Sequence, residues 1–366
     1  MTTAHVVGPP RLRRLEEISA RDARRRLLRV AWLQHRGAYL ALLAVFIVFV
    51  SAIALERIRV DGSYAAFVAD GCVGRQLTTS TCDTATLALG GRSMFASLGI
   101  ALSALPLLVG VFVGAPLVSR EIESGTFRFA WTQATPRARL VFATLAVLAG
   151  GAAGMTAVLG LLFGGWYAHV YYVVRASLDS QWQATPFATT WWLLPVWTLS
   201  ALAISALVGT IIRRSVAAMA ATAALVGGLI YAGHALLPAL RHLGASTARL
   251  QLQSAVANFA AGTISPQSQR SWHLPPGSWL LGAWMTGPGG HVLGRSASAH
   301  VRNAFSIWTA SGAARWRAAH HDAFWVSYQP PSHFWMLQGA EGVVLLAVAT
   351  LCVLATACML GRRAAA

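Results

Sequence analysis

The chain has 366 residues, of which 56% are hydrophobic and only 11% charged, and its mean hydropathy is +0.55. Globular proteins have about a quarter of their residues charged, so this composition excludes an ordinary soluble protein of two or three domains. Several runs of more than about 18 residues carry no charge, which indicates membrane-spanning helices. The sequence therefore predicts an integral membrane protein.

The first 36 residues are predicted to form a cytosolic tail followed by an interfacial amphipathic helix. This region contains nine arginines. Leu28 and Trp32 fall at helical spacing opposite Arg25 and Arg29, as in a helix that lies on the membrane surface. The basic region is too long for a cleavable signal peptide, and no small-residue cleavage site follows the apolar run.

Six apolar runs predict six transmembrane helices, so the expected fold is an all-α polytopic membrane protein. The predicted spans cover residues 37–55, 93–118, 140–166, 191–212, 215–237 and 334–360. The first five form one transmembrane region, 37–237, with a loop over 56–92 and a kink at Pro106. An irregular extracytoplasmic insertion is expected over 238–333, and 334–366 hold the last span with a short cytosolic tail.

The arginines predict the orientation of these spans. All 29 residues counted as Lys and Arg are arginine. With both termini in the cytosol, the inner segments hold 17 arginines in about 66 residues, and the outer segments hold the other 12 in about 157. The chain is thus expected to be a multi-pass protein of the cell membrane, with cytosolic termini. Because topology accounts for the net charge of +17, no nucleic-acid partner is expected.

The absence of lysine also excludes two chemistries. A P-loop ATPase needs a lysine to hold the nucleotide phosphates, and Schiff-base catalysis needs a lysine amine. This chain is therefore expected to bind no cofactor. Any ATP and Mg²⁺ that drive the protein belong on a separate partner chain.

The cysteines show no spacing typical of a metal site, and no metal is expected. Cys72 and Cys82 fall in the loop predicted to lie outside the cytosol, where they either form a disulfide or remain two free thiols. Cys352 and Cys358 lie in the last apolar run and are expected to be free thiols within it.

Glu341 is an acidic residue within the last predicted span. A carboxylate at that depth costs up to about 3 kcal/mol unless it is solvated or paired. One interpretation places Glu341 on the path of a cationic substrate or a proton. The other places it in a wet outer vestibule, or in a hydrogen bond with a neighbouring helix.

A compact charged segment separates the second and third spans. It reads REIESGTFRFAWTQATPRARL from Arg120, although the 26 residues before Ser119 carry no charge. Apolar side chains recur at helical spacing, and Pro136 ends the pattern. Gly125 interrupts it between Ser124 and Thr126, both good N-cap residues, which predicts two short helical pieces joined by an elbow.

This segment resembles the cytosolic coupling segment of type 2 ABC exporter permeases. The Glu-x-x-x-Gly-Thr signature falls at Glu121, Gly125 and Thr126, and WTQATPR is similar to the form seen in actinobacterial permease subunits. A second motif before the last span, YQPPSHFW from Tyr328, resembles the YQPxSxFW sequence of that family. The basic helix before the first span and the six-span layout also fit.

The resemblance implies a permease subunit that pairs with a second permease chain, identical or different, and docks on a separate ATPase subunit. The coupling segment would be residues 119–139, with ATPase contacts from Glu121, Glu123, Gly125, Thr126 and Arg128. Glu121 would supply charge at the interface, Gly125 would allow close backbone approach, and Thr126 would cap the second helical piece. The substrate would move outward, whether drug, peptide or lipid-like, and the permease itself would not be an enzyme.

Two other functions remain open from the residues alone. The first is a sensory or structural membrane protein whose cytosolic helix binds a partner that is not an ATPase. The second is a membrane enzyme with an outer-face site, for which His320, His321 and Asp322 are the candidate residues.

Overall fold

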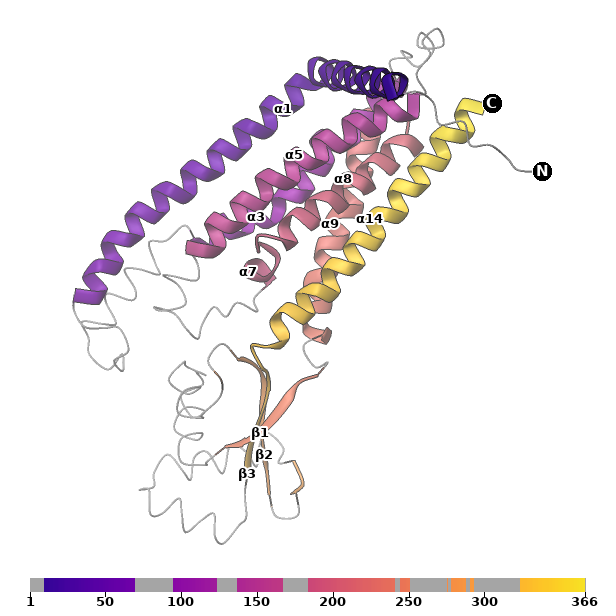
Figure 1. Cartoon of the computed structure of the whole chain (residues 1–366). Coiled ribbons are helices and arrows are strands. Elements are labelled where there is room, and N and C mark those ends of the chain that lie inside the picture. Colours follow the sequence, from indigo (N-terminus) through magenta and orange to yellow (C-terminus); the bar gives the residue numbers. More distant parts are fainter. Residues whose placement is uncertain are drawn as a thin grey trace.

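The computed structural model describes residues 10–69, 95–123, 137–166, 184–240, 244–250, 275, 278–287, 290–292 and 323–365. Six helical segments of this part are long and apolar enough to cross a membrane, which confirms the predicted fold class. The helices are α1 (Pro10–Ala69), α3 (Phe95–Val109), η1 (Gly110–Gly114), α4 (Ala115–Glu123), α5 (Arg137–Trp166), α7 (Ala184–Ala188), α8 (Leu193–Ile211), α9 (Ser215–Leu240) and α14 (His333–Ala365). Figure 1 shows the long helices running side by side as one bundle.

Helix α1 corrects the prediction that the first span ends at residue 55 and is followed by a loop. The helix continues without a break to Ala69. The charged residues after 55 end the apolar run but not the helix, and Arg57 and Asp61 form an i,i+4 ion pair at 3.6 Å. Hydropathy marks where apolar sequence ends, and backbone hydrogen bonds can carry a helix further.

The second crossing combines α3, the π-helical turn η1 and α4. The Ala115 N–H donates to the Gly110 carbonyl five residues earlier, which is the hydrogen bond of a π-helix. Pro106 lies inside α3, four residues before this turn, and has no N–H to donate. The kink at Pro106 stays a prediction, and the irregularity that the structure shows is the π-helical turn that begins four residues after the proline.

Helix α8 forms the centre of the bundle. In an 18-residue window of its span, 72% of the residues are buried, against 6% in the corresponding window of α1. Glycine allows its neighbours to approach closely: a Cβ on Gly114 would lie 1.8 Å from the Ser205 Oγ, and one on Gly209 would lie 3.0 Å from the Ala115 carbonyl oxygen. Small residues at helix contacts are typical of membrane bundles, in which close packing replaces the hydrophobic effect.

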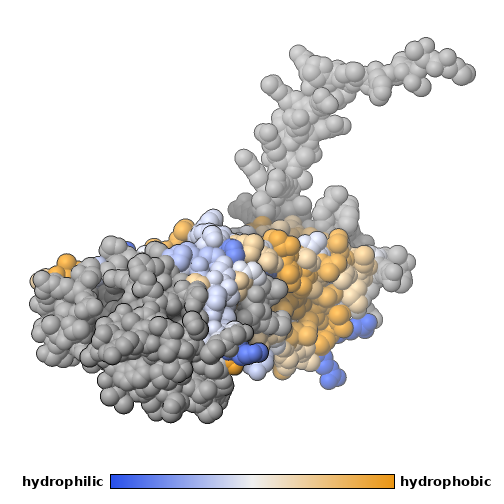
Figure 2. Space-filling model, turned by 90° about the horizontal axis from the view of Figure 1, so that it is seen from below, coloured by the Kyte–Doolittle hydropathy of each residue, from blue (hydrophilic) through white to orange (hydrophobic). Residues whose placement is uncertain are grey.

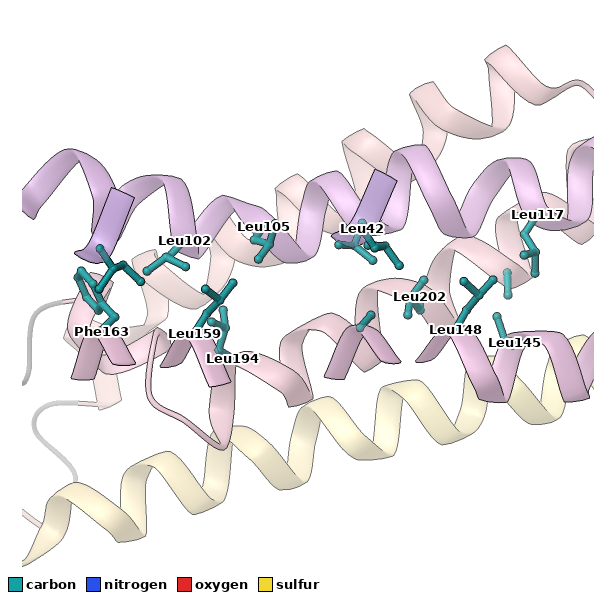
Figure 3. Packing of buried hydrophobic residues seen from close by; sticks show 14 of the residues in the cluster. Leu42, Leu102, Leu105, Leu117, Leu145, Leu148, Leu159, Phe163, Leu194 and Leu202 are labelled. Carbon is teal, nitrogen blue, oxygen red and sulfur yellow. The ribbon is translucent and has the colours of Figure 1, made fainter. Parts of the chain in front are cut away.

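The largest buried cluster joins side chains of α1, α3, α4, α5 and α8 (Figure 3). Its labelled members are Leu42, Leu102, Leu105, Leu117, Leu145, Leu148, Leu159, Phe163, Leu194 and Leu202. The outward faces are also apolar, with exposed side chains such as Ile47, Phe112 and Leu351. Figure 2 shows such residues as a broad orange area over the described helices. An apolar exterior of this extent suits a lipid environment.

The insertion between α9 and α14 contains a three-stranded antiparallel sheet, which corrects the prediction of an irregular insertion. Its strands are β1 (Ser246–Leu250), β2 (Trp279–Thr286) and β3 (Ala323–Gln329), in the order β1-β3-β2. Strands of this length are too short for a long hydropathy window to detect. The sheet lies at one end of the bundle, and the N-terminal part of α1 and the C-terminal end of α14 lie at the other (Figure 1).

Candidate functional site

Two polar regions of the bundle contain the predicted site residues that the structure describes. The first lies where α4 ends and α9 begins. The Glu123 carboxylate accepts a 3.0 Å hydrogen bond from the Ser215 backbone N–H and a second bond from the Ser215 hydroxyl. The first N–H groups of a helix lack partners within the helix, and a carboxylate there also interacts favourably with the helix dipole. Glu123 therefore caps α9 from another helix.

The surroundings of Glu123 favour its ionised form. Hydrogen bonds from the Ser215 hydroxyl and backbone N–H lower the pKa of the exposed Glu123 carboxyl below its ordinary value of 4.5. The positive charges of Arg214 and Arg120 act in the same direction, against an opposing effect of desolvation. At neutral pH the contact is therefore a charge-assisted one between a carboxylate and a helix N-terminus.

The other predicted coupling residues fall where the structure gives less detail. Glu121 lies in the last turn of α4, and its side chain is not described. Gly125, Thr126 and Arg128 belong to residues 124–136, which lie outside the described part. The same holds for Cys72 and Cys82, for which a disulfide and two free thiols are both open, and for His320, His321 and Asp322.

Sequence reasoning missed Ser215 as a partner of Glu123. A serine directly before an apolar run is a recognisable signal for the start of a helix. Nothing in the sequence, however, indicates that a glutamate 92 residues away supplies the acceptor.

The second polar region lies between α8 and α14, towards the end of the bundle that carries the sheet. Gln338 in α14 is fully buried and uses both ends of its amide. Its oxygen accepts a 2.9 Å hydrogen bond from the Trp192 Nε1–H, and its nitrogen donates to the Phe187 carbonyl at 2.8 Å and to the Thr190 hydroxyl at 3.2 Å. These bonds fasten α14 to the segment that leads into α8.

Glu341 lies one turn further along α14, on the same side. Its Oε1 accepts a 2.8 Å hydrogen bond from the Trp197 Nε1–H of α8. One turn beyond, the Ser200 hydroxyl of α8 donates to the Leu345 carbonyl at 3.0 Å. The interpretation in which Glu341 bonds a neighbouring helix is thus confirmed, and its role on a substrate path stays a prediction.

The indoles of Trp192 and Trp197 pack against glycine residues of α14 and α9. A Cβ on Gly342 would lie 2.6 Å from a ring carbon of Trp192, and one on Gly233 of α9 would lie 3.5 Å from the ring of Trp197. Trp197 is buried in an aromatic-rich cluster with Phe187, Leu193, Phe334 and Leu345. The partly buried Glu341 carboxylate therefore contacts the indole of Trp197, and the next residue in α14, Gly342, packs against the ring of Trp192.

In the part of the chain that the structure describes, six membrane-crossing helical segments with α8 at their centre, and polar contacts at both ends of the bundle, define a multi-pass membrane protein. The family model described as "ABC-2 membrane transporter related" matches residues 42–237. Since this match covers more than half of the chain, the protein belongs to that family of membrane transporters. Comparisons with curated proteins and with solved structures gave no significant match.

Proposed function

We propose that this chain is the permease subunit of an ATP-driven exporter, coupled through residues 119–139 to a separate ATPase subunit. The observation that carries the proposal is the match of residues 42–237 to an ABC-2 membrane transporter family, because such permeases act with ATPase partners. The matched region includes the whole charged segment between α4 and α5.

The contact between Glu123 and Ser215 supports the proposal that movement of the coupling segment is transmitted to the helices at this end of the bundle. Glu123 ends α4 within the proposed coupling segment, and its carboxylate accepts hydrogen bonds from the first residue of α9. A movement of residues 124–136 would therefore displace both α4 and α9. The tight contact of α4 and η1 with α8 would pass the movement on to the centre of the bundle.

In this proposal two permease chains pair in the cell membrane, with their termini and coupling segments in the cytosol. ATP and Mg²⁺ bind on the partner ATPase, as the absence of lysine from this chain requires. Closure of the ATPase subunits moves the substrate outward. This chain contributes the path and the coupling surface and carries out no bond chemistry.

Co-purification with an ATPase encoded beside this chain tests the proposal. The native chain is compared with a Glu121→Arg, Gly125→Trp double variant, and membrane insertion is checked for both. A Gly361→Trp variant is the matched control, since the space around Gly361, at the same end of the bundle, is open. The native and control chains should retain the ATPase, and the double variant should lose it.

Retention of the ATPase by the double variant would contradict the assignment of the coupling segment. If the native chain retains no ATPase, while the same preparation retains another cytosolic protein, the sensory function becomes the better explanation. ATP hydrolysis by the co-purified complex distinguishes a true ATPase partner from an inactive one.

A further inference from the structure

Two polar side chains of α14, Gln338 and Glu341, face α8 towards the sheet end of the bundle. Hydrogen bonds between the helices explain why residue 338 is polar, but they do not explain why residue 341 carries a charge. Gln338 has both ends of its amide paired, so its polarity is accounted for by fastening α14 in place. Glu341 has one hydrogen bond, from Trp197, for two carboxylate oxygens that can accept several. A glutamine would accept that bond equally well without bringing a charge.

Glu341 also lies at a depth where a charge is costly. It is eight residues after His333, about 12 Å along the helix at a rise of 1.5 Å per residue, inside the span His333–Gly361. Among the residues that the structure describes, Trp197 is the only hydrogen-bond donor to Glu341, and no arginine or histidine pairs with it. Ionisable residues within membrane spans are rare, and those that occur usually serve a binding partner or a transport path.

The surroundings of the carboxylate indicate what kind of partner fits. Trp197 packs on Gly233 and Trp192 packs on Gly342, the residue that follows Glu341. Phe187 and Phe334 belong to the same buried cluster as Trp197. Aromatic rings with one carboxylate are suited to an organic cation, because the rings stabilise both its apolar body and its positive charge. A divalent metal ion would need several oxygen ligands, and Glu341 supplies the only carboxylate here among the described residues.

We propose that Glu341, with the indoles of Trp197 and Trp192, forms a recognition site for lipophilic cations on the export path. This inference rests on the proposed function, since it names the substrate class of the exporter. The carboxylate supplies the charge, Trp197 fixes its orientation, and the two indoles accept the apolar body of the ligand.

Binding of tetraphenylphosphonium to the full chain in nanodiscs tests this site. The lipids carry no amine, and binding to empty nanodiscs is subtracted. Tetraphenylborate is the matched probe, with nearly the same shape and the opposite charge. Glu341→Gln removes the charge but keeps an oxygen for Trp197. Asp61→Asn is the matched control, because it removes one carboxylate from an exposed position at the end of α1.

The native chain and Asp61→Asn should bind tetraphenylphosphonium saturably with equal affinity, and Glu341→Gln should bind at least tenfold more weakly. Tetraphenylborate should show no saturable binding. Equal binding by Glu341→Gln, or no saturable binding by the native chain, would overturn the inference. If Glu341→Gln does not fold, Trp197→Phe replaces it: this variant keeps the charge and a ring but loses the N–H that orients the carboxylate, so it should bind more weakly, and unchanged binding in a folded chain would count against the site.

The binding measurement needs no ATPase, so its failure is distinguishable from failure of the proposed function. If the chain retains its ATPase but cation binding is independent of Glu341, the site is overturned and the proposed function stands. A chain that binds the cation through Glu341 but retains no ATPase has the site without the proposed coupling.

Discussion

At the scale of single residues, Glu123 has the contact whose pH dependence is most directly predicted. Its pKa is lower in the folded chain than the ordinary value of 4.5, because the ionised carboxylate accepts two hydrogen bonds from Ser215. The stabilisation is therefore fully present above pH 4.5 and is lost as the pH falls through the lower folded-state value. Glu123→Gln should lower the melting temperature at neutral pH, and the difference from the native chain should shrink in acid.

Serine variants separate the cap from a general effect of substitution. Ser215→Ala removes the hydroxyl donor to Glu123 and should also lower the melting temperature at neutral pH. Ser63→Ala is the matched control, because the Ser63 hydroxyl donates only to the Arg59 carbonyl of its own helix, at 3.4 Å. A constant difference between Glu123→Gln and the native chain over the whole pH range would contradict the predicted role of the charge.

The sequence predicted the residue types at these sites better than their partners. Glu341 stands out because it is a charge inside an apolar run, and Glu123 because it lies in a charged segment. Their partners, Trp197 and Ser215, are 144 and 92 residues away in the chain. Such pairs depend on which helices become neighbours, and periodicity and composition carry no information about that.

At the scale of elements, the crossing of η1 over α8 depends on Gly114. A Cβ there would lie 1.8 Å from the Ser205 Oγ and 2.9 Å from the Ser205 Cβ, so the helices must move apart. Gly114→Ala should destabilise the bundle by about 1–3 kcal/mol, the usual cost of overpacking. Thermal unfolding of the purified chain in detergent measures the effect.

Gly228→Ala in α9 is the matched control for Gly114→Ala. Apart from the adjacent residues and backbone of α9 itself, no atom lies within 4 Å of the position its Cβ would occupy. The change should therefore be neutral or should stabilise α9 by up to about 1 kcal/mol, because alanine is the better helix former. Equal melting temperatures for the two variants would show that the close crossing at Gly114 does not hold the bundle together.

Most elements could be predicted because a membrane span has a strong local signal. The bounds of α5, α8, α9 and α14 lie close to the predicted spans, since each apolar run is long enough to cross the bilayer and ends at polar residues. The predicted end of the first span was wrong because helix and apolar run do not end together in α1. The sheet was missed because β1 and β2 reach β3 from far along the chain, and only pairing makes them strands.

At the scale of the whole molecule, the number of crossings determines which segments share a side of the membrane. Six spans place the turn between α8 and α9, the proposed coupling segment and the end of α14 on one side, and the sheet on the other. The distribution of the arginines indicates that the side with the proposed coupling segment faces the cytosol. The proposed function requires the same assignment, because ATP and the ATPase are in the cytosol.

Cysteine labelling of intact cells tests this orientation. In a chain whose four native cysteines are replaced by alanine, Val292→Cys introduces a thiol at an exposed position on the sheet side, and Arg213→Cys introduces one in the exposed turn before α9. A membrane-impermeant maleimide should label Val292→Cys in intact cells and Arg213→Cys only after permeabilisation. Gly361→Cys, at the end of α14, should behave like Arg213→Cys. The reverse pattern would place residues 119–139 outside the cell, where no ATPase could reach them, and would contradict the proposed coupling while leaving the six-span fold intact.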